Sequence, residues 1–369
     1  MRILANAEEM APVSGIASQT LEVAEELARR GHRVQLVHLR GGPYAERYAA
    51  CCDTIRVVPA LDLDVRHLIR DAPKLAPAVR AGVATHPDVI YVNRFRPLPW
   101  GVATRALTRA PVVCHLHGDV GLRHPSVNRG LGRLTARFLC VSHFVRDRFV
   151  ELGGDPTRTE VIHNGVDLSE YPPGGLAERS AARAELGIDE EVELVMYFGR
   201  VGEAKGVHVL VDALAGLVGG PRPVELLIVG QSVDESYERR VLGSVPGLRI
   251  HRLAERTAVV TPLHAADLVV VPSVWEEPFG RTVIEGMATG RPVIASAVGG
   301  IPEILGGEFG RFLVPPGDVP ALTARIRELL DWREQEGDLA AACSGLVSRK
   351  FSKAVMVDTV ERALADAAG

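Results

Sequence analysis

The feature that most constrains the fold is a regular alternation of short aliphatic runs with longer segments of helical periodicity. In the first half of the chain, strands are expected at residues 2–5, 33–39, 54–58, 88–92, 112–116, 138–142 and 160–163. The clearest helix between them covers residues 16–30, which have an apolar face and are followed by Gly31 as C-cap. Such alternation is typical of βα units, in which parallel strands are packed between helices.

The alternation restarts after residues 171–175 (Tyr-Pro-Pro-Gly-Gly), a turn-rich stretch that is typical of a linker. Beyond it, strands are expected at 193–198, 224–229, 248–252, 267–271 and 292–295, and helices at 207–217, 235–242, 281–288, 322–330, 339–346 and 355–367. A length of 369 residues is ample for two domains. We therefore predict an α/β protein with two doubly wound Rossmann-like domains, residues 1–170 and 171–351, facing across a cleft. Ligands of such sheets bind beyond the carboxyl ends of the strands.

Composition narrows the class of protein. Hydrophobic residues make up 47% of the chain and charged residues 24%, which excludes a disordered chain. A membrane-spanning run of about 18 apolar residues is missing, and the N-terminus leads directly into a predicted strand without the layout of a signal peptide. The five cysteines include the adjacent pair Cys51 and Cys52, which suits neither a disulfide framework nor a zinc site. A cytoplasmic location is expected.

The net charge of −4 conceals an uneven distribution. Residues 1–170 carry 22 Lys and Arg against 18 acids, and the rest of the chain carries 20 against 28. Residues 91–149 hold ten arginines against two acids, Asp119 and Asp147. This stretch is either solvated surface, a face for an anionic acceptor, or a peripheral contact with an anionic membrane at the inner membrane face. Nucleic acid is not expected as a partner, because the sequence has no basic stripe interleaved with aromatics.

A glycine-rich turn at residues 199–206 follows a predicted strand and precedes a helix. Arg200 and Lys205 lie across this turn, so both cations can converge on one anion. The helix start at Gly206 adds backbone N–H groups and a positive dipole end. A diphosphate would satisfy this arrangement. The alternative is a helix-initiating turn with two surface cations.

Residues 277–285 also connect a strand to a helix and carry a carboxylate at each end. Glu277 lies in the loop and Glu285 in the second turn of the helix, so the two can bind different parts of one ligand. Between them lie the N–H donors expected of a helix start, on Phe279, Gly280, Arg281 and Thr282. Glu277 could instead only complement the helix dipole, whereas Glu285 lies among apolar positions and needs a polar partner.

Three further signals are weaker. Residues 297–304 form another glycine-containing turn before a helix, which is either a binding turn or a plain βα turn. In the first domain, Gly15 follows Ser14 at the start of the long helix and could contact an anion. His117 ends a predicted strand and should project toward a ligand, unless it is structural. The chain has no Gly-x-Gly-x-x-Gly segment, which argues against a dinucleotide dehydrogenase.

Together these segments resemble the retaining family 4 glycosyltransferases of the GT-B fold. The resemblance is carried by Gly-Arg-x4-Lys-Gly, the Glu-x7-Glu segment from Glu277 to Glu285, Gly290-x-Pro292-Val-Ile, Gly299-Gly300-x-Pro302-Glu303, Asn164-Gly165-Val166-Asp167 and Pro316-Gly317-Asp318. The order and spacing match across nearly the whole chain. Such enzymes bind a nucleotide-diphosphate sugar in the C-terminal domain and the acceptor in the N-terminal domain.

The resemblance implies that Arg200 and Lys205 neutralise the departing diphosphate, so that no divalent metal or other cofactor is expected. Gly15 would approach the phosphate, and His117 would lie by the sugar ring near the reacting carbon. The C-terminal helix, about residues 352–369, would pack back on the first domain. Retention of the anomeric configuration would follow from same-face attack, because the sequence offers no evident nucleophile for a double displacement.

The remaining implied roles concern the rest of the donor. Glu285 would hydrogen-bond the ribose, and Glu277 would hold the sugar hydroxyls together with the N–H groups at the helix start. The base would lie near Arg252 and Leu253, where the family commonly has glycine. The acceptor would be a hydroxylated small molecule, a glycan or a glycolipid. The alternatives are a GT-B sugar-nucleotide epimerase or hydrolase, although such epimerases lack the Glu-x7-Glu arrangement, and a catalytically silent nucleotide-sugar binding protein.

Overall fold

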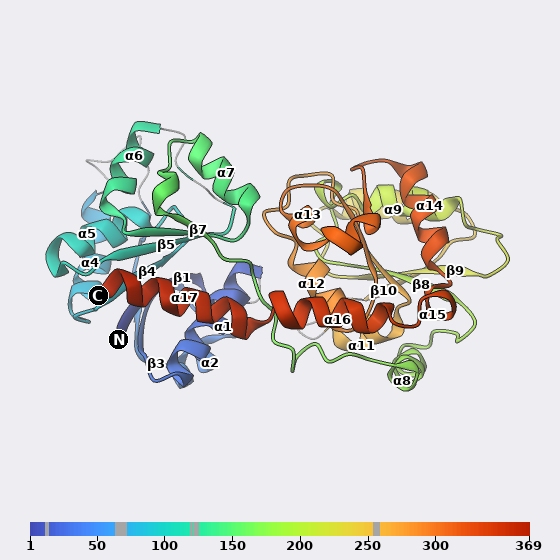
Figure 1. Cartoon of the computed structure of the whole chain (residues 1–369), viewed down its shortest axis with the longest axis horizontal. Helices are drawn as coiled ribbons and strands as arrows, with labels where there is room; N and C mark the ends of the chain where they lie inside the picture. The colour runs from blue at the N-terminus through green and yellow to red at the C-terminus, as the bar shows by residue number, and fades with distance from the viewer. Residues whose placement is uncertain (12–14, 63–71, 119–120, 122–124, 254–258) are drawn as a thin grey trace. The chain divides into compact units, whose positions relative to one another are not determined.

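The computed structural model in Figure 1 describes residues 1–11, 15–62, 72–118, 121, 125–253 and 259–369. Ser14 of the predicted anion-binding turn, and Asp119 and Arg123 of the arginine-rich stretch, lie outside the described residues. In the described part of the chain, no helix is long and apolar enough to cross a membrane.

The chain divides into two compact units. Unit 1 comprises Met1–Asn164 and Lys353–Gly369, and unit 2 comprises Gly165–Ser352. The division therefore falls shortly before Tyr171, where the sequence placed the boundary. Each unit contains its own parallel sheet.

Unit 1 is built on a seven-stranded sheet with the order β3-β2-β1-β4-β5-β6-β7. Its strands are β1 (Arg2–Glu9), β2 (Arg33–Arg40), β3 (Cys52–Val57), β4 (Val89–Asn93), β5 (Val112–Leu116), β6 (Arg137–Cys140) and β7 (Thr159–Val161). Its helices are α1 (Gly15–Arg29), α2 (Ala45–Cys51), η2 (Ala72–Leu75), α4 (Ala76–Val83), α5 (Leu98–Thr108), α6 (Pro125–Leu134), α7 (His143–Glu151), η3 (Pro156–Arg158) and α17 (Lys353–Ala368). Figure 1 shows α6 and α7 on one side of the sheet and α1 and α17 on the other.

Strand β1 is longer than its apolar run indicated. The sequence prediction ended at Ala5, but β1 stays in register with β2 as far as the pair Glu9 and Arg40. Asn6, which interrupts the apolar run, is buried: its Oδ1 accepts the backbone N–H of Asn93 at 2.8 Å, and its Nδ2 donates to the Asn93 carbonyl at 3.3 Å. The strand order reverses between β1 and β4, so these bonds join the two strands at the switch point of unit 1.

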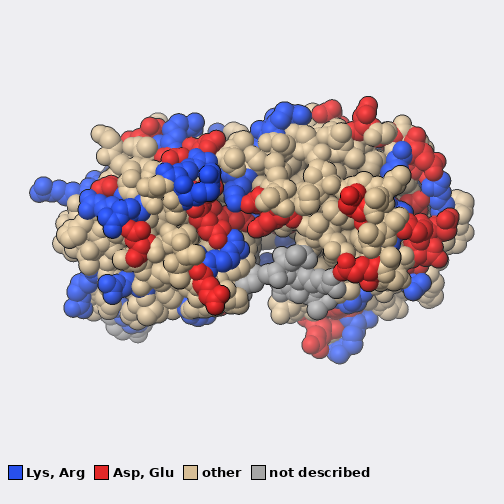
Figure 2. Space-filling model, turned by 90° about the horizontal axis from the view of Figure 1, so that it is seen from below, with Lys and Arg blue, Asp and Glu red and all other residues tan. Residues whose placement is uncertain are grey.

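Helix α17 packs on unit 1, although it follows unit 2 in the sequence. It contributes to the buried core of unit 1 through Met356, Val357, Val360, Ala363 and Leu364. Arg30, directly after α1, donates to Glu361 at 2.6 Å and pairs with Asp358 at 2.7 Å. Apolar burial and ion pairs together attach α17 to this unit. Elsewhere on the surface, Figure 2 shows acidic and basic side chains interspersed on one face of unit 1.

Unit 2 contains a six-stranded parallel sheet with the order β10-β9-β8-β11-β12-β13. Its strands are β8 (Glu193–Phe198), β9 (Val224–Val229), β10 (Arg249–Leu253), β11 (Leu268–Val271), β12 (Val293–Ser296) and β13 (Leu313–Val314). Its helices are α8 (Leu176–Leu186), η4 (Glu203–Lys205), α9 (Val207–Ala215), α10 (Glu235–Leu242), α11 (Val260–Ala265), α12 (Arg281–Ala288), α13 (Ile301–Ile304), η5 (Gly307–Phe312), α14 (Val319–Leu329), α15 (Trp332–Gln335) and α16 (Leu339–Lys350). The predicted doubly wound α/β class is confirmed. The sequence missed β13, since two residues at a sheet edge show no periodicity.

A buried charge network joins three elements of unit 2. Asp267, next to β11, pairs with Arg183 at 2.5 Å and Arg179 at 2.9 Å, both on α8, and with Arg333 on α15. It also accepts the Leu194 N–H of β8 at 2.7 Å. Burial by itself would raise the pKa of Asp267, but the three guanidinium groups outweigh burial and hold that pKa below its usual range.

Replacing Asp267 with alanine should lower the free energy of unfolding by about 3–5 kcal/mol, because three cations lose their buried counter-charge. Urea denaturation followed by circular dichroism measures this loss. The control is Asp147→Ala, which removes an exposed carboxylate paired with Arg146 and should cost at most about 1 kcal/mol. Equal, small losses in both variants would show that the network does not stabilise unit 2.

Candidate functional site

The loops after β8 and β11 meet at the carboxyl edge of the sheet of unit 2. The strand order runs from β8 outward to β9 and β10 on one side, and through β11 and β12 on the other. The reversal between β8 and β11 is the switch point at which doubly wound sheets bind ligands. Arg200 and Lys205 lie in the first of these loops and Glu277 in the second.

Glycines hold the loop after β8 against the loop after β9. Gly199 has a φ of 136°, and a Cβ on Gly230 would lie 2.0 Å from the Gly199 carbonyl oxygen. The Tyr197 hydroxyl donates to the carbonyl of Arg200 at 2.5 Å. The side chain of Arg200 is exposed, and its guanidinium forms no ion pair with the residues that the structure describes. The backbone of Arg200 is thus fixed while its charge is open to a ligand.

Lys205 and Glu277 are in direct contact, although the sequence placed them in separate motifs. The ammonium of Lys205 donates to Oε1 of Glu277, and the Ser273 hydroxyl donates to the same oxygen at 2.7 Å. The Trp275 ring also lies against the ammonium, 5.3 Å from Nζ to the ring centroid. The Lys205 and Glu277 side chains are 23% and 11% exposed, so water screens this pair only in part.

Backbone contacts fix the two loops against each other. Gly206 precedes α9 with a φ of 69°, and a Cβ there would lie 1.9 Å from the carbonyl oxygen of Pro272. The N–H of Val274 donates to the carbonyl of Ala204 at 3.0 Å. Only glycine fits at position 206, because any side chain would push the loops apart.

The glycine turn after β12 positions the backbone of Glu277. A Cβ on Gly299 would lie 1.9 Å from the Glu277 carbonyl oxygen, which accepts the N–H of Gly300 at 2.8 Å. The sequence left this turn as either a binding turn or a plain βα turn. In the structure it supports the loop that carries Glu277.

Helix α12 carries the second carboxylate of the Glu-x7-Glu segment. Glu285 accepts from Nε of Arg281 at 2.7 Å, and both side chains are mostly buried. The polar partner that Glu285 requires thus lies one turn earlier in the same helix. Gly280 precedes the helix with a φ of 102°, Thr282 is half-buried in the first turn, and Phe279 is buried.

His117 of unit 1 directly follows β5 and is 6% exposed. Neither of its ring nitrogens has a hydrogen-bond partner among the described residues. Burial, and then His115 and Arg94, hold the pKa of His117 well below its usual range. Burial also lowers the pKa of the adjacent His115 to about 3; Nδ1 of His115 lies 2.6 Å from the Tyr91 hydroxyl. His117 is therefore a neutral imidazole that can hydrogen-bond a ligand.

Arg94 and Gly15 are two other residues of unit 1 that concern ligand binding. Arg94, directly after β4, adopts a left-handed φ of 79°, which is uncommon for arginine, and donates to Glu8 at 2.6 Å. Gly15 is exposed at the first position of α1, where its contact with a phosphate stays a prediction.

Sequence reasoning missed Trp275, Ser273, Tyr91 and the strained backbone of Arg94. Trp275 and Ser273 lie close to Glu277 in the chain, so their proximity to a predicted site residue was the available signal. The bond from Tyr91 to His115 joins neighbouring strands, and the φ of Arg94 depends on tertiary packing. Neither leaves a pattern in the sequence.

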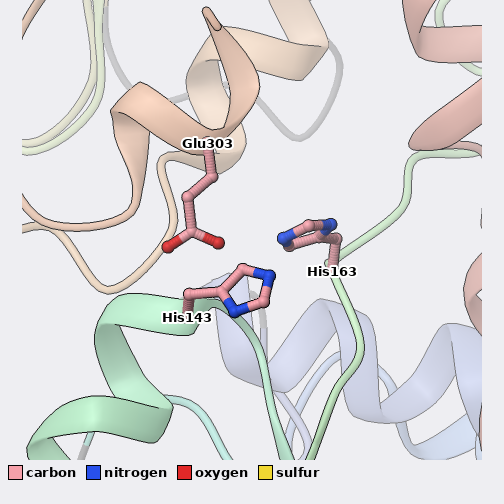
Figure 3. Close-up of side chains that lie close together, drawn as sticks. All are labelled: His143, His163 and Glu303. Carbon is pink, nitrogen blue, oxygen red and sulfur yellow. The ribbon is translucent and has the colours of Figure 1, made fainter.

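His143 and His163 form a second histidine pair in unit 1, with ring centroids 6.1 Å apart and the rings edge to face (Figure 3). Glu303, drawn in the same figure, belongs to unit 2. Two imidazoles are fewer than the three protein ligands of a typical catalytic zinc site, so the pair does not define a metal centre in unit 1.

The arginines of residues 91–149 are partly neutralised within unit 1. Arg94 pairs with Glu8, Arg146 with the adjacent Asp147 at 2.8 Å, and Arg148 with the next acid along α7, Glu151, at 3.4 Å. Arg109, Arg129 and Arg133 are exposed. Contact with a membrane or with an anionic acceptor stays a prediction.

Comparison with known protein families agrees with the predicted fold class. The family model described as "Glycosyltransferase Family 4" matches residues 13–170, and the model described as "Glycosyl transferases group 1" matches residues 192–331. The architecture is that of the GT-B glycosyltransferases. The chain belongs to glycosyltransferase family 4, as its motifs indicated.

The similar proteins include bacterial glycosyltransferases. The D-inositol 3-phosphate glycosyltransferase of Mycobacteroides abscessus is 33% identical over 60% of this chain, and the match spans 50% of that relative. The relative of the same name from Mycolicibacterium smegmatis is 27% identical over 95% of this chain and 87% of its own length. The crystal structure of HepE from Anabaena in complex with UDP has a TM-score of 0.85 and 25% identity, covering 99% of this chain and 100% of that one.

The lowered pKa values of His115 and His117 should make the stability of unit 1 depend on pH. Both pKa values are depressed in the folded state, so the unfolded chain binds more protons below its histidine pKa of about 6.5 and stability falls as pH decreases from there. His115→Gln should reduce the slope of unfolding free energy against pH, between about pH 5 and about pH 6, by up to about 1.4 kcal/mol per pH unit. Urea denaturation at the two pH values measures this slope. The control is His86→Gln, which replaces an exposed histidine. A slope in His115→Gln equal to that of the wild type would contradict the neutral state of His115.

Proposed function

We propose that the protein is a retaining glycosyltransferase that moves a hexose-type sugar from a nucleotide-diphosphate sugar to a hydroxylated acceptor without a divalent metal. The observation that carries this proposal is the contact between Lys205 and Glu277 at the switch point of unit 2. It joins a cation suited to a phosphate with a carboxylate suited to sugar hydroxyls. Phosphate and sugar are the two groups joined by the bond that breaks when a sugar nucleotide donates its sugar.

The diphosphate is proposed to bind Lys205 and Arg200. Negative charge develops on the leaving group as the sugar departs, and fixed cations stabilise that charge in the transition state. The N-terminus of α9 adds a positive dipole end directly after Gly206. Two cations and a helix terminus thus replace the charge that a divalent metal supplies in other phosphate sites.

Glu285 is proposed to bind the ribose, and the base is proposed to lie near Arg252 and Leu253. Arg252 is held by Glu238, with Nε 2.5 Å from the carboxylate. HepE from Anabaena has been solved with UDP and with UDP-glucose, which supports UDP and UDP-glucose as first probes for this chain.

The acceptor is proposed to be a hydroxylated small molecule, a glycan or a glycolipid. The names of the relatives, inositol 3-phosphate glycosyltransferases, support a polyhydroxylated acceptor. His117 is neutral, and neither ring nitrogen is bonded to any residue that the structure describes; its imidazole is proposed to hydrogen-bond a hydroxyl of the sugar next to the reacting carbon.

In the proposed reaction the acceptor oxygen bonds to the anomeric carbon on the face from which the phosphate leaves. The bond between the anomeric carbon and the phosphate oxygen breaks, and its electron pair stays on the diphosphate. The acceptor proton passes to the departing phosphate oxygen. Configuration is retained because attack and departure share one face.

The test is transfer from UDP-glucose to a panel of acceptors in the presence of a chelator. Lys205→Ala and Arg200→Ala should each lower kcat/KM by at least about 100-fold, the cost of removing one transition-state charge partner. The control is Arg239→Ala, which removes an exposed cation on α10 and should leave the rate unchanged.

Three results would contradict the proposal. Transfer that needs a divalent ion would remove the metal-independent role of the two cations. Wild-type rates in both alanine variants would remove the diphosphate site, and release of free glucose without transfer would instead indicate a hydrolase.

A further inference from the structure

Trp275 lies beside the ion pair that carries the proposed function. Its side chain is 41% exposed in the loop after β11, whereas Trp100 and Trp332 are buried. The N–H of the preceding residue, Val274, anchors this loop to Ala204, directly before Lys205. This bond places the backbone of Trp275 beside that of Lys205.

The indole is an attractive surface for the Lys205 ammonium. Nζ lies 5.3 Å from the ring centroid, within the range of about 6 Å for cation–π attraction. This attraction acts through the ring face and occupies no particular N–H of the ammonium, which has three donors. Glu277 takes one donor. Lys205 is thus restrained by two neighbours and keeps further donors for a ligand.

We propose that Trp275 is a positioning residue for the donor diphosphate, because its indole face holds the ammonium of Lys205 in place before the nucleotide binds. A lysine has a flexible four-carbon stem, so an unrestrained ammonium has to be ordered when the ligand arrives. Restraining it beforehand reduces that cost and strengthens binding. The inference rests on the proposed function and adds to it a residue that does not itself touch the diphosphate.

The competing explanation is that Trp275 stacks directly on the nucleotide. The two explanations differ in whether the effect of Trp275 passes through Lys205. A double-mutant cycle separates them, because an effect that acts through Lys205 disappears when Lys205 is replaced.

The experiment is isothermal titration calorimetry with UDP on the full chain, comparing wild type, Trp275→Leu, Trp275→Phe, Lys205→Met and the double variant with Leu and Met. Trp275→Leu keeps apolar bulk but removes the π face and should raise the Kd about threefold to thirtyfold. Trp275→Phe keeps a π face and should restore most of the affinity. In the Lys205→Met background, Trp275→Leu should change the Kd by less than about twofold.

The matched control is Arg240→Met, which removes another cation–π pair of unit 2, with the guanidinium carbon 5.6 Å from the Tyr237 ring centroid. UDP should bind this variant as it binds wild type. The inference is overturned if Trp275→Leu binds UDP like wild type, or if its loss of affinity is as large in the Lys205→Met background. A wild-type protein that does not bind UDP overturns the inference for a uridine donor, whereas transfer from another nucleotide-diphosphate sugar would still support the proposed function.

Discussion

The contact between Lys205 and Glu277 depends on two loops being held together across the switch point of unit 2. Neither side chain could reach the other if the loops were farther apart. Gly206 permits the close approach to Pro272, and the bond from Val274 to Ala204 maintains it. The turn at Gly299 in turn supports the backbone of Glu277. Glycines spread over the sequence thus serve one purpose, the placement of opposite charges at the carboxyl edge of the sheet.

Unit 2 contains two kinds of ion pair, which differ in how deeply their carboxylates are buried. Asp267 and its arginines are closed off from solvent on the carboxylate side, so their charges are satisfied within the protein and stabilise the fold. Lys205 and Glu277 are mostly buried but keep 23% and 11% of their side chains exposed, and each keeps hydrogen-bonding capacity beyond the other. Only the second pair is suited to exchange partners when a ligand binds.

Much of the fold could be predicted from the sequence, because buried parallel strands and amphipathic helices leave strong patterns. The bounds of β8, β9 and α12 follow from runs of apolar residues between glycines and polar turns. The continuation of β1 past Asn6 could not be predicted, since a buried asparagine looks like the end of a strand until its partner, Asn93, is known. Likewise, the motifs identified Lys205 and Glu277 separately, but their contact, and that of Trp275 with Lys205, depends on the order of strands in the sheet.

The central claim is that the switch point of unit 2 binds the diphosphate of a sugar nucleotide. A crystal structure of the protein with UDP tests it most directly. The account predicts phosphate oxygens within hydrogen-bonding distance of the Lys205 ammonium and the Arg200 guanidinium, and ribose hydroxyls on Glu285. A UDP molecule bound elsewhere, or a diphosphate held through a metal ion with Lys205 still paired only to Glu277, would contradict the account.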